Sequence, residues 1–239
     1  MSPDKVIKRR RRGTSLTAAP PPRTANRIFY AVAEGRVTEY DYLTMLQNAY
    51  AASCSFRIDM PSPSSRTDDM TPLRIAEHAL AVADDDAKRR HGQYEEIWAI
   101  FDRDEHIDVL EAFKVVRGHP KIKIAFSHPS FDFWLLLHFR SFNVPQNGNN
   151  DDVHTRLAAC PGFNGFGKVE KKITGPRAKE LLPQIGTAVR NAKALSRHCD
   201  EGRCTHGRGH RQFCGHLEQD PSTGMWRLLE SLGITQLLT

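Results

Sequence analysis

The chain has 239 residues, 39% of them apolar, and a formal net charge of +6. A chain of this length with this many apolar residues can form one sizeable hydrophobic core. The longest apolar run, FDFWLLLHF at 131–139, is far shorter than the ~20 residues that a membrane span needs, and no apolar signal segment follows the basic start. We therefore expect a cytoplasmic protein with no membrane partner. An odd count of five cysteines argues against a secreted disulfide framework.

The positive charge is concentrated before residue 26, where seven Lys and Arg side chains face one aspartate, a net of +6. This segment has little apolar content and contains the run AAPPP, so we predict a disordered basic tail over residues 1–25. The tail could contact nucleic-acid phosphates non-specifically, or it could simply be solubilising. The run of cations that would make the contact is Lys8, Arg9, Arg10, Arg11 and Arg12.

From residue 26 onward, short β-rich runs alternate with segments of helical apolar spacing. The predicted strands are 28–32, 55–60, 95–101 and 121–126. The predicted helices between them are 38–52, with Thr38 as a candidate N-cap, 72–90 and 107–117. This alternation is typical of βαβ units and a parallel sheet.

After residue 127 the pattern becomes mostly helical. The expected helices are a fully buried one within 131–139, then 151–159, 176–198 and 222–232. We therefore predict an α/β fold, in which a four-stranded, mostly parallel sheet flanked by helices (26–145) carries a helical C-terminal extension (146–239).

Acidic residues follow two of the predicted strands. Glu34 and Gly35 follow the first strand, and Asp102 and Asp104 follow the third, in the sequence IFDRDEH. The carboxyl ends of parallel strands share one edge of a sheet, so these side chains should converge there. Carboxylates at such short separation raise each other's pKa. A bound Mg²⁺ would relieve the repulsion between them. The simpler alternative is a polar turn that caps the next helix. A nucleotide-sugar transferase site also uses Asp-x-Asp but would leave Glu34-Gly35 unexplained.

Four sequence blocks point to a known family. VAEGRVTEYDYL, YEEIWAIFDRDEH, AFSHPSFDFWLLLHF and DPSTGMWRLLESL occur in this order and resemble the RloB-like family. The Glu-Gly and Asp-x-Asp pairs also resemble the Toprim domain of primases, topoisomerases and OLD-family nucleases. The resemblance runs from about residue 27 to 233. It implies a Toprim-like fold and a bacterial nuclease, encoded with an AAA- or ABC-type ATPase partner in phage-defence or abortive-infection systems.

The resemblance also implies roles for individual residues. Glu34 matches the family's metal ligand or general acid/base, Asp102 and Asp104 match its metal-binding pair, and Glu39 matches a second glutamate near the same edge.

The third block departs from the family pattern. It reads Ser-His-Pro-Ser-Phe-Asp-Phe-Trp where the family usually has Ser-Asn-Pro-x-Phe-Glu-Leu-Trp, so His128 replaces Asn and Asp132 replaces Glu. A carboxylate in so apolar a helix is costly unless it is paired or liganded. This favours a metal-site role for Asp132 over an N-terminal cap.

The implied chemistry is Mg²⁺- or Mn²⁺-dependent hydrolysis of a DNA or RNA phosphodiester, in which one or two cations activate water and neutralise the phosphate. A lysine would add positive charge, and in GFGKVEKK we favour Lys168 for that role; a solvated basic face is the alternative. Two other functions stay open: a non-cleaving module that docks nucleic acid for its partner, and a phosphatase or nucleotidyltransferase acting on small substrates. The sequence also leaves open whether the protein forms a homo-oligomer.

Residues 198–216 contain three cysteines and four histidines. Thiolate and imidazole groups are the usual ligands of structural Zn²⁺, but no Cys-x-x-Cys pair is present. A zinc site, a metal-free His-rich loop and redox chemistry are the three interpretations. The favoured zinc ligands are Cys199, Cys204, His210 and Cys214.

Overall fold

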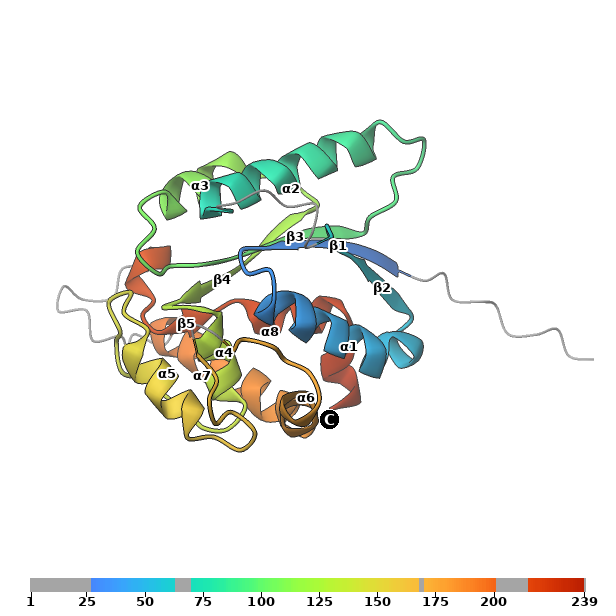
Figure 1. Cartoon of the computed structure of the whole chain (residues 1–239). Helices are drawn as coiled ribbons and strands as arrows, with labels where there is room; N and C mark the ends of the chain where they lie inside the picture. The colour runs from blue at the N-terminus through green and yellow to red at the C-terminus, as the bar shows by residue number, and fades with distance from the viewer. Residues whose placement is uncertain (1–26, 63–69, 168–169, 201–214, 239) are drawn as a thin grey trace, which may run out of the picture.

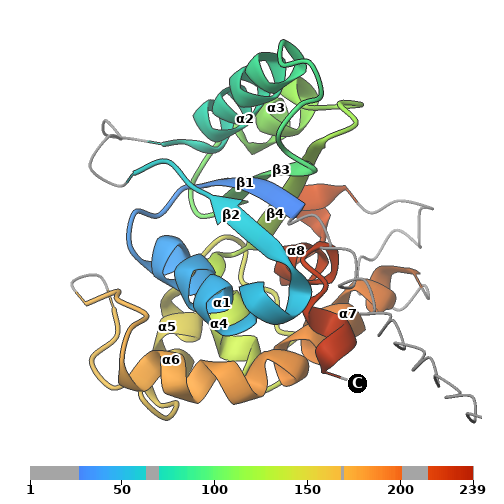
Figure 2. The same cartoon turned by 90° about the vertical axis from the view of Figure 1, so that its right-hand side faces the viewer.

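The computed structural model describes residues 27–62, 70–167, 170–200 and 215–238. They form an α/β fold in which a five-stranded mixed sheet lies between two layers of helices (Figures 1 and 2). The predicted basic tail lies outside these residues. Within the described ranges, no helix is both long and apolar enough to cross a membrane.

The strand order in the sheet is β2-β1-β3-β4-β5. Neighbouring strands among the first four are parallel, and β5 runs antiparallel to β4. The strands are β1 (Arg27–Ala33), β2 (Phe56–Asp59), β3 (Glu96–Asp102), β4 (Ile122–His128) and β5 (Ser222–Thr223). The predicted count of four strands was therefore wrong, because β5 has only two residues and is too short to leave a periodic pattern.

Two helices cover one face of the sheet and the remaining helices cover the other (Figure 1). The first pair is α2 (Pro72–Ala87) and α3 (Val109–Val115). The second layer consists of α1 (Thr38–Cys54), α4 (Phe131–Leu137), α5 (Asp151–Ala158), α6 (Pro176–Leu181), α7 (Ile185–Asp200) and α8 (Met225–Ser231). Each face has its own hydrophobic cluster. Side chains of α1, α4 and the C-terminal helices share one of them, so the predicted extension packs directly against the sheet.

Helix α4 lies at the centre of that second layer. All seven of its residues are buried, which explains why the run is apolar on every side. Behind it, His138 is fully buried; its Nδ1 lies 3.0 Å from the carbonyl oxygen of Trp134 and its Nε2 lies 3.2 Å from the Tyr42 hydroxyl. The rigid core thus extends to the residues that follow β4, where Asp132 lies.

Three predicted helices need correction. The last of them, 222–232, begins only at Met225, because Ser222 and Thr223 form β5. The segment predicted as one helix over 176–198 is divided into α6, a 3₁₀ turn (Leu182–Gln184) and α7, because Pro183 has no N–H to continue the α-helical bonding. Helix α1 has Val37, not Thr38, at its N-cap position. The Thr38 hydroxyl instead donates a hydrogen bond to the carbonyl of Lys171, at 3.0 Å.

Candidate active site

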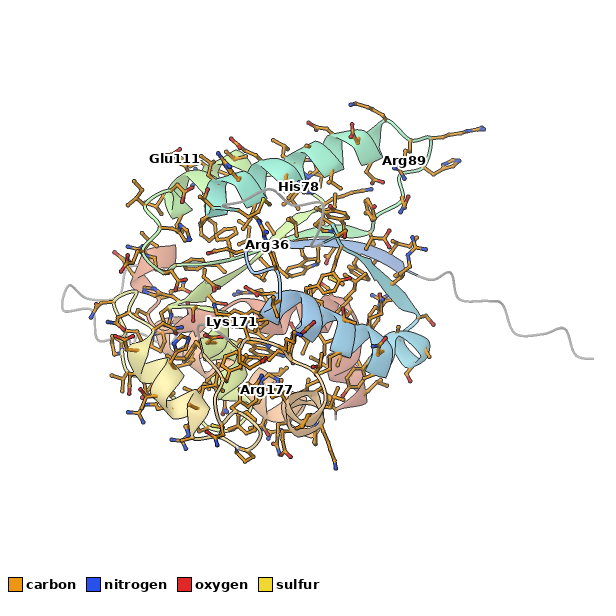
Figure 3. The ribbon with its side chains drawn as sticks, in the orientation of Figure 1. Arg36, His78, Arg89, Glu111, Lys171 and Arg177 are labelled. Atoms are coloured by element: carbon orange, nitrogen blue, oxygen red, sulfur yellow. The ribbon has the colours of Figure 1, made fainter. Side chains whose placement is uncertain are left out.

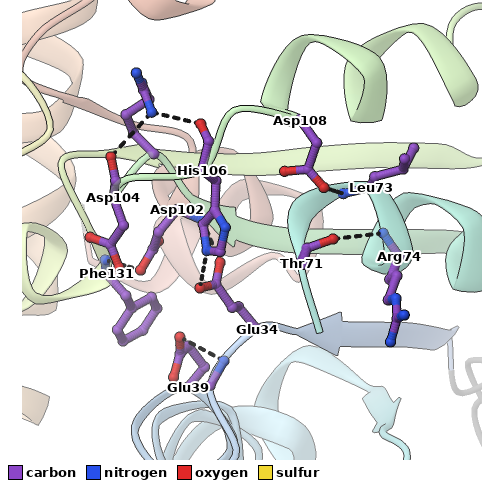
Figure 4. A network of polar contacts seen from close by, with 12 residues as sticks. Glu34, Glu39, Thr71, Leu73, Arg74, Asp102, Asp104, His106, Asp108 and Phe131 are labelled. Atoms are coloured by element: carbon purple, nitrogen blue, oxygen red, sulfur yellow. Dashed lines mark hydrogen bonds and ion pairs between the residues drawn. The ribbon is translucent and has the colours of Figure 1, made fainter. Parts of the chain in front are cut away.

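The carboxyl ends of β1 and β3 meet because these strands are neighbours in the sheet. Glu34 directly follows β1, and its backbone N–H donates to the carbonyl of Ile100 at 3.0 Å. Asp102 is the last residue of β3, and its backbone N–H lies 3.3 Å from Oε2 of Glu34. Figure 4 shows Glu34, Glu39, Asp102 and Asp104 at this end of the sheet.

All five predicted metal-site carboxylates line one cavity of about 400 Å³. They come from the end of β1, the first turn of α1, the end of β3 with the loop after it, and the first turn of α4. The five residues are Glu34, Glu39, Asp102, Asp104 and Asp132. The structure therefore brings together all five carboxylates that the sequence proposed for this site.

Glu39 occupies space that Gly35 leaves open. The Glu39 side chain is buried, and its Oε1 accepts a hydrogen bond from the backbone N–H of Gly35 at 3.1 Å. A Cβ atom on residue 35 would lie 1.9 Å from Oε2 of Glu39. A larger residue at position 35 would therefore have to displace the Glu39 carboxylate from its present place.

Asp102 is the most deeply enclosed acid at the end of a strand, with 7% of its surface exposed. Its Oδ2 accepts the backbone N–H of Phe131 at 2.8 Å. Its Oδ1 is buried and has no hydrogen-bond partner among the described residues. Leaving a buried acceptor without a partner costs free energy, and a cation is the kind of partner this oxygen lacks.

The loop after Asp102 is held in place by backbone and arginine contacts. The backbone N–H groups of Arg103 and Asp104 donate to the carbonyls of Ser127 (2.8 Å) and Pro129 (3.0 Å). The guanidinium of Arg103 donates to the carbonyls of Asp104 (3.1 Å) and His106 (2.7 Å). Arg103 therefore fixes the shape of the loop that carries Asp104.

Burial and mutual repulsion raise the pKa of several of these acids. Burial is the main cause for Glu39, whose pKa rises to about 7 with contributions from the charges of Asp132 and Glu34. The pKa of Asp104 rises to about 6 through burial and the charge of Glu34. The pKa of Asp102 is raised well above its ordinary value for the same reasons. A divalent cation would reverse these shifts by favouring the ionised carboxylates.

Two histidines that the sequence analysis did not assign to the site bind its carboxylates. His106 Nε2 lies 2.9 Å from Oε1 of Glu34, and His154 Nε2 lies 2.5 Å from Oδ2 of Asp132. The hydrogen bond to Asp132 raises the pKa of His154. His106 stands within IFDRDEH, so its place in the motif was a usable signal. His154 lies on α5, and no local pattern links it to Asp132.

The carboxylates do not form a ready coordination shell. No group of three or more His, Cys, Asp or Glu side chains within the described ranges is arranged to hold a metal ion. The oxygens are instead engaged by His106, His154 and backbone N–H groups. By chemistry the donor set nevertheless fits a hard divalent cation, since it consists of carboxylate oxygens and one of them, Asp102 Oδ1, is buried without a hydrogen bond.

Two cations line the same cavity, Arg36 on the loop before α1 and Lys171 on the segment before α6 (Figure 3). Two hydrogen bonds hold the segment around Lys171 against α1. The Thr38 hydroxyl donates to the carbonyl of Lys171, and the backbone N–H of Ile173 donates to the carboxylate of Asp41 at 2.9 Å. Lys168, the lysine favoured from the sequence, lies outside the described residues. Among the described lysines, Lys171 is the one that lines the cavity.

Other predicted residues cannot be placed. Cys199 lies in α7, but its side chain is outside the described part, as are Cys204, His210 and Cys214. The same holds for the tail cations, Lys8, Arg9, Arg10, Arg11 and Arg12. The zinc site and the tail contact with nucleic acid stay predictions.

The family model described as RloB-like protein matches residues 29–232. This covers most of the chain, and the chain therefore belongs to the RloB-like family. Searches of curated proteins and of solved structures find no match.

Proposed function

We propose that the chain is a Toprim-like nuclease that hydrolyses phosphodiester bonds in nucleic acid with Mg²⁺ or Mn²⁺. One observation carries the proposal: five carboxylates from separate elements meet in one cavity at the carboxyl edge of a parallel sheet. The buried Oδ1 of Asp102, which has no hydrogen-bond partner among the described residues, supplies an oxygen that a cation could bind. Membership of the RloB-like family and the Glu-Gly and Asp-x-Asp pairs support a fold of the Toprim kind.

The carboxylates of Glu34, Asp102 and Asp104 would hold the cation, with Glu39 and Asp132 beside them. When bound, a divalent cation supplies charge neutralisation at the phosphate and lowers the pKa of a water molecule. His106 and His154 orient the carboxylates that they bind and keep ligand oxygens directed at the cavity.

Arg36 and Lys171 supply positive charge at the same cavity. We assign them the binding of the non-bridging phosphate oxygens. Lys171 thereby takes the role that the sequence had given to Lys168.

We further propose that the protein acts in antiphage defence with an ATPase partner. The support is family resemblance, since RloB-like proteins are typically encoded beside such an ATPase. The basic tail would add non-specific affinity for phosphate backbone.

The proposal is tested by incubating the purified protein with single- and double-stranded DNA and RNA in Mg²⁺, Mn²⁺ or chelator. We expect divalent-dependent cleavage that Glu34→Gln lowers by about 10²–10⁴-fold. The matched control is Glu77→Gln, because Glu77 is exposed on α2, away from the cavity. Undiminished cleavage by Glu34→Gln would contradict the proposal.

The second candidate is a non-cleaving module that binds metal and nucleic acid for its partner. The observation that favours it is that protein donors already engage the site carboxylates. This candidate predicts Mn²⁺-dependent binding of nucleic acid by the wild type without product formation, with or without the ATPase.

A further inference from the structure

A second cavity, of about 880 Å³, opens beside the carboxylate site. One wall is the loop 103–106 and the other is the segment 147–151. Asp104, Asn150 and His154 line both cavities, so the two cavities adjoin. A substrate whose phosphate lies over the carboxylates therefore has room for a neighbouring group here.

Both cavities are acidic, but of the five carboxylates assigned to the cation only Asp104 lines the second. Its walls carry Asp104, Glu105 and Asp151, and Arg103 is the single Arg or Lys among the described residues that line it. The Arg103 guanidinium is bound to the carbonyls of Asp104 and His106. Without a bound divalent cation such a cavity repels a phosphate, because like charges repel and the guanidinium of Arg103 is engaged by backbone carbonyls. It suits a neutral group with hydroxyl and amine donors.

The segment that forms the second wall is held rigidly against the loop. Gly148 has a φ of +83°, and a Cβ there would lie 2.8 Å from the carbonyl oxygen of Asp104, so only glycine permits this approach. The buried carboxylate of Asp220 accepts the backbone N–H groups of Gln146 (2.8 Å) and Asn147 (2.5 Å). The wall is thereby preformed, which lowers the entropy cost of binding.

The side chain of Asn147 is exposed at this wall and makes no hydrogen bond to another described residue. An asparagine amide offers both a donor and an acceptor and can pair with the edge of a base. The neighbouring carboxylates can accept from sugar hydroxyls.

We propose that the second cavity binds the nucleoside next to the scissile phosphate, taking its sugar and base rather than a second phosphate. The proposal rests on the proposed function, because it presumes that a phosphate lies over the carboxylates. Asn147 is then a specificity residue and not a catalytic one.

The test is calorimetry in Mn²⁺ with inorganic phosphate, adenosine 5′-monophosphate and adenosine 3′-monophosphate as probes. We expect at least one nucleotide to bind about tenfold or more tightly than inorganic phosphate, the gain expected of a few hydrogen bonds. Asn147→Leu should remove most of that gain and leave the affinity for inorganic phosphate within about twofold, since one uncharged side chain in a separate cavity is changed. Asn147→Asp, which keeps the shape and loses the donor, should act in the same direction.

The matched control is Asn143→Leu, because Asn143 is exposed on the same connection and lines neither cavity. If phosphate binds but the nucleotides bind no better, or if Asn147→Leu and Asn147→Asp leave nucleotide affinity unchanged, the nucleoside site is overturned while the phosphate site stands. If no probe binds, both the nucleoside site and the proposed function are overturned.

Discussion

Gly35 and Glu39 illustrate how single residues shape the site. The first turn of α1 places the Glu39 carboxylate where a Cβ of residue 35 would otherwise be. Glu39 is buried and accepts the backbone N–H of Gly35, so a side chain at residue 35 would displace its carboxylate and break this bond. The position of Glu39 therefore depends on the glycine of the Glu34-Gly35 pair that follows β1.

We expect Gly35→Ala to displace the Glu39 carboxylate and to weaken Mn²⁺ binding by about 10–100-fold, the range seen when groups supporting a metal site are changed. The measurement is Mn²⁺ calorimetry, with circular dichroism to establish that the fold is kept. Gly167→Ala is the control, because a Cβ there meets nothing within 4 Å. Equal affinity in the two variants would show that Glu39 has no part in binding.

The sequence identified all five carboxylates that line the cavity, because strand ends and family motifs mark them. It did not assign His106 to the site, although His106 lies within the motif IFDRDEH and contacts Glu34. It could not find His154 or Asn150, because they reach Asp132 across 22 and 18 residues without any periodic signal. Such contacts depend on how α5 packs and not on local sequence.

The short strand β5 attaches the C-terminal helices to the sheet. Gly224, just after β5, donates its backbone N–H to the carbonyl of Phe126 at 2.8 Å. A Cβ on Gly224 would lie 3.1 Å from Cα of Ala125 and 3.2 Å from the backbone N of Phe126. These are backbone atoms of a central strand, so they cannot yield as a flexible side chain would.

We expect Gly224→Ala to destabilise the protein by about 1–3 kcal/mol through overpacking between β4 and α8. Urea unfolding measures the change, with Gly167→Ala again as the control. A stability equal to that of the control would mean that β5 and α8 can move away from β4 freely.

At the scale of elements, the regular strands and helices were predictable because their apolar spacing is periodic. Helix α4 was predicted as buried for the same reason, since its run is apolar all round. A two-residue strand and the break at Pro183 leave only weak local signals. The strand forms because its residues pair with β4. The helix breaks because Pro183 has no backbone N–H to donate.

Several acids are buried between the sheet and the second layer of helices. The stability of the folded protein therefore depends on pH. The pKa of Glu39 rises from 4.5 to about 7 on folding, so the folded protein holds that proton more tightly than the unfolded chain. Its contribution to stability is complete below about pH 4.5 and is lost as the pH rises through about 7.

We therefore expect Glu39→Gln, which cannot ionise, to gain stability relative to the wild type as the pH rises from 5 to 8 in chelator. The measurement is urea unfolding of both proteins across this range. Added Mn²⁺ should stabilise the wild type most at the upper end, where the carboxylates are ionised. A stability difference that does not change with pH would contradict the raised pKa.

We propose that the acids at the ends of β1 and β3 bind a divalent cation. The most direct measurement is Mn²⁺ calorimetry on the wild type, on Asp102→Asn/Asp104→Asn and on the control Asp84→Asn/Asp85→Asn, whose acids are exposed on α2. We predict that the wild type and the control bind Mn²⁺ and that Asp102→Asn/Asp104→Asn does not. Equal binding by all three proteins, or no binding by the wild type, would rule out the cation site and leave Asp102-Arg103-Asp104 as a turn at the end of a strand.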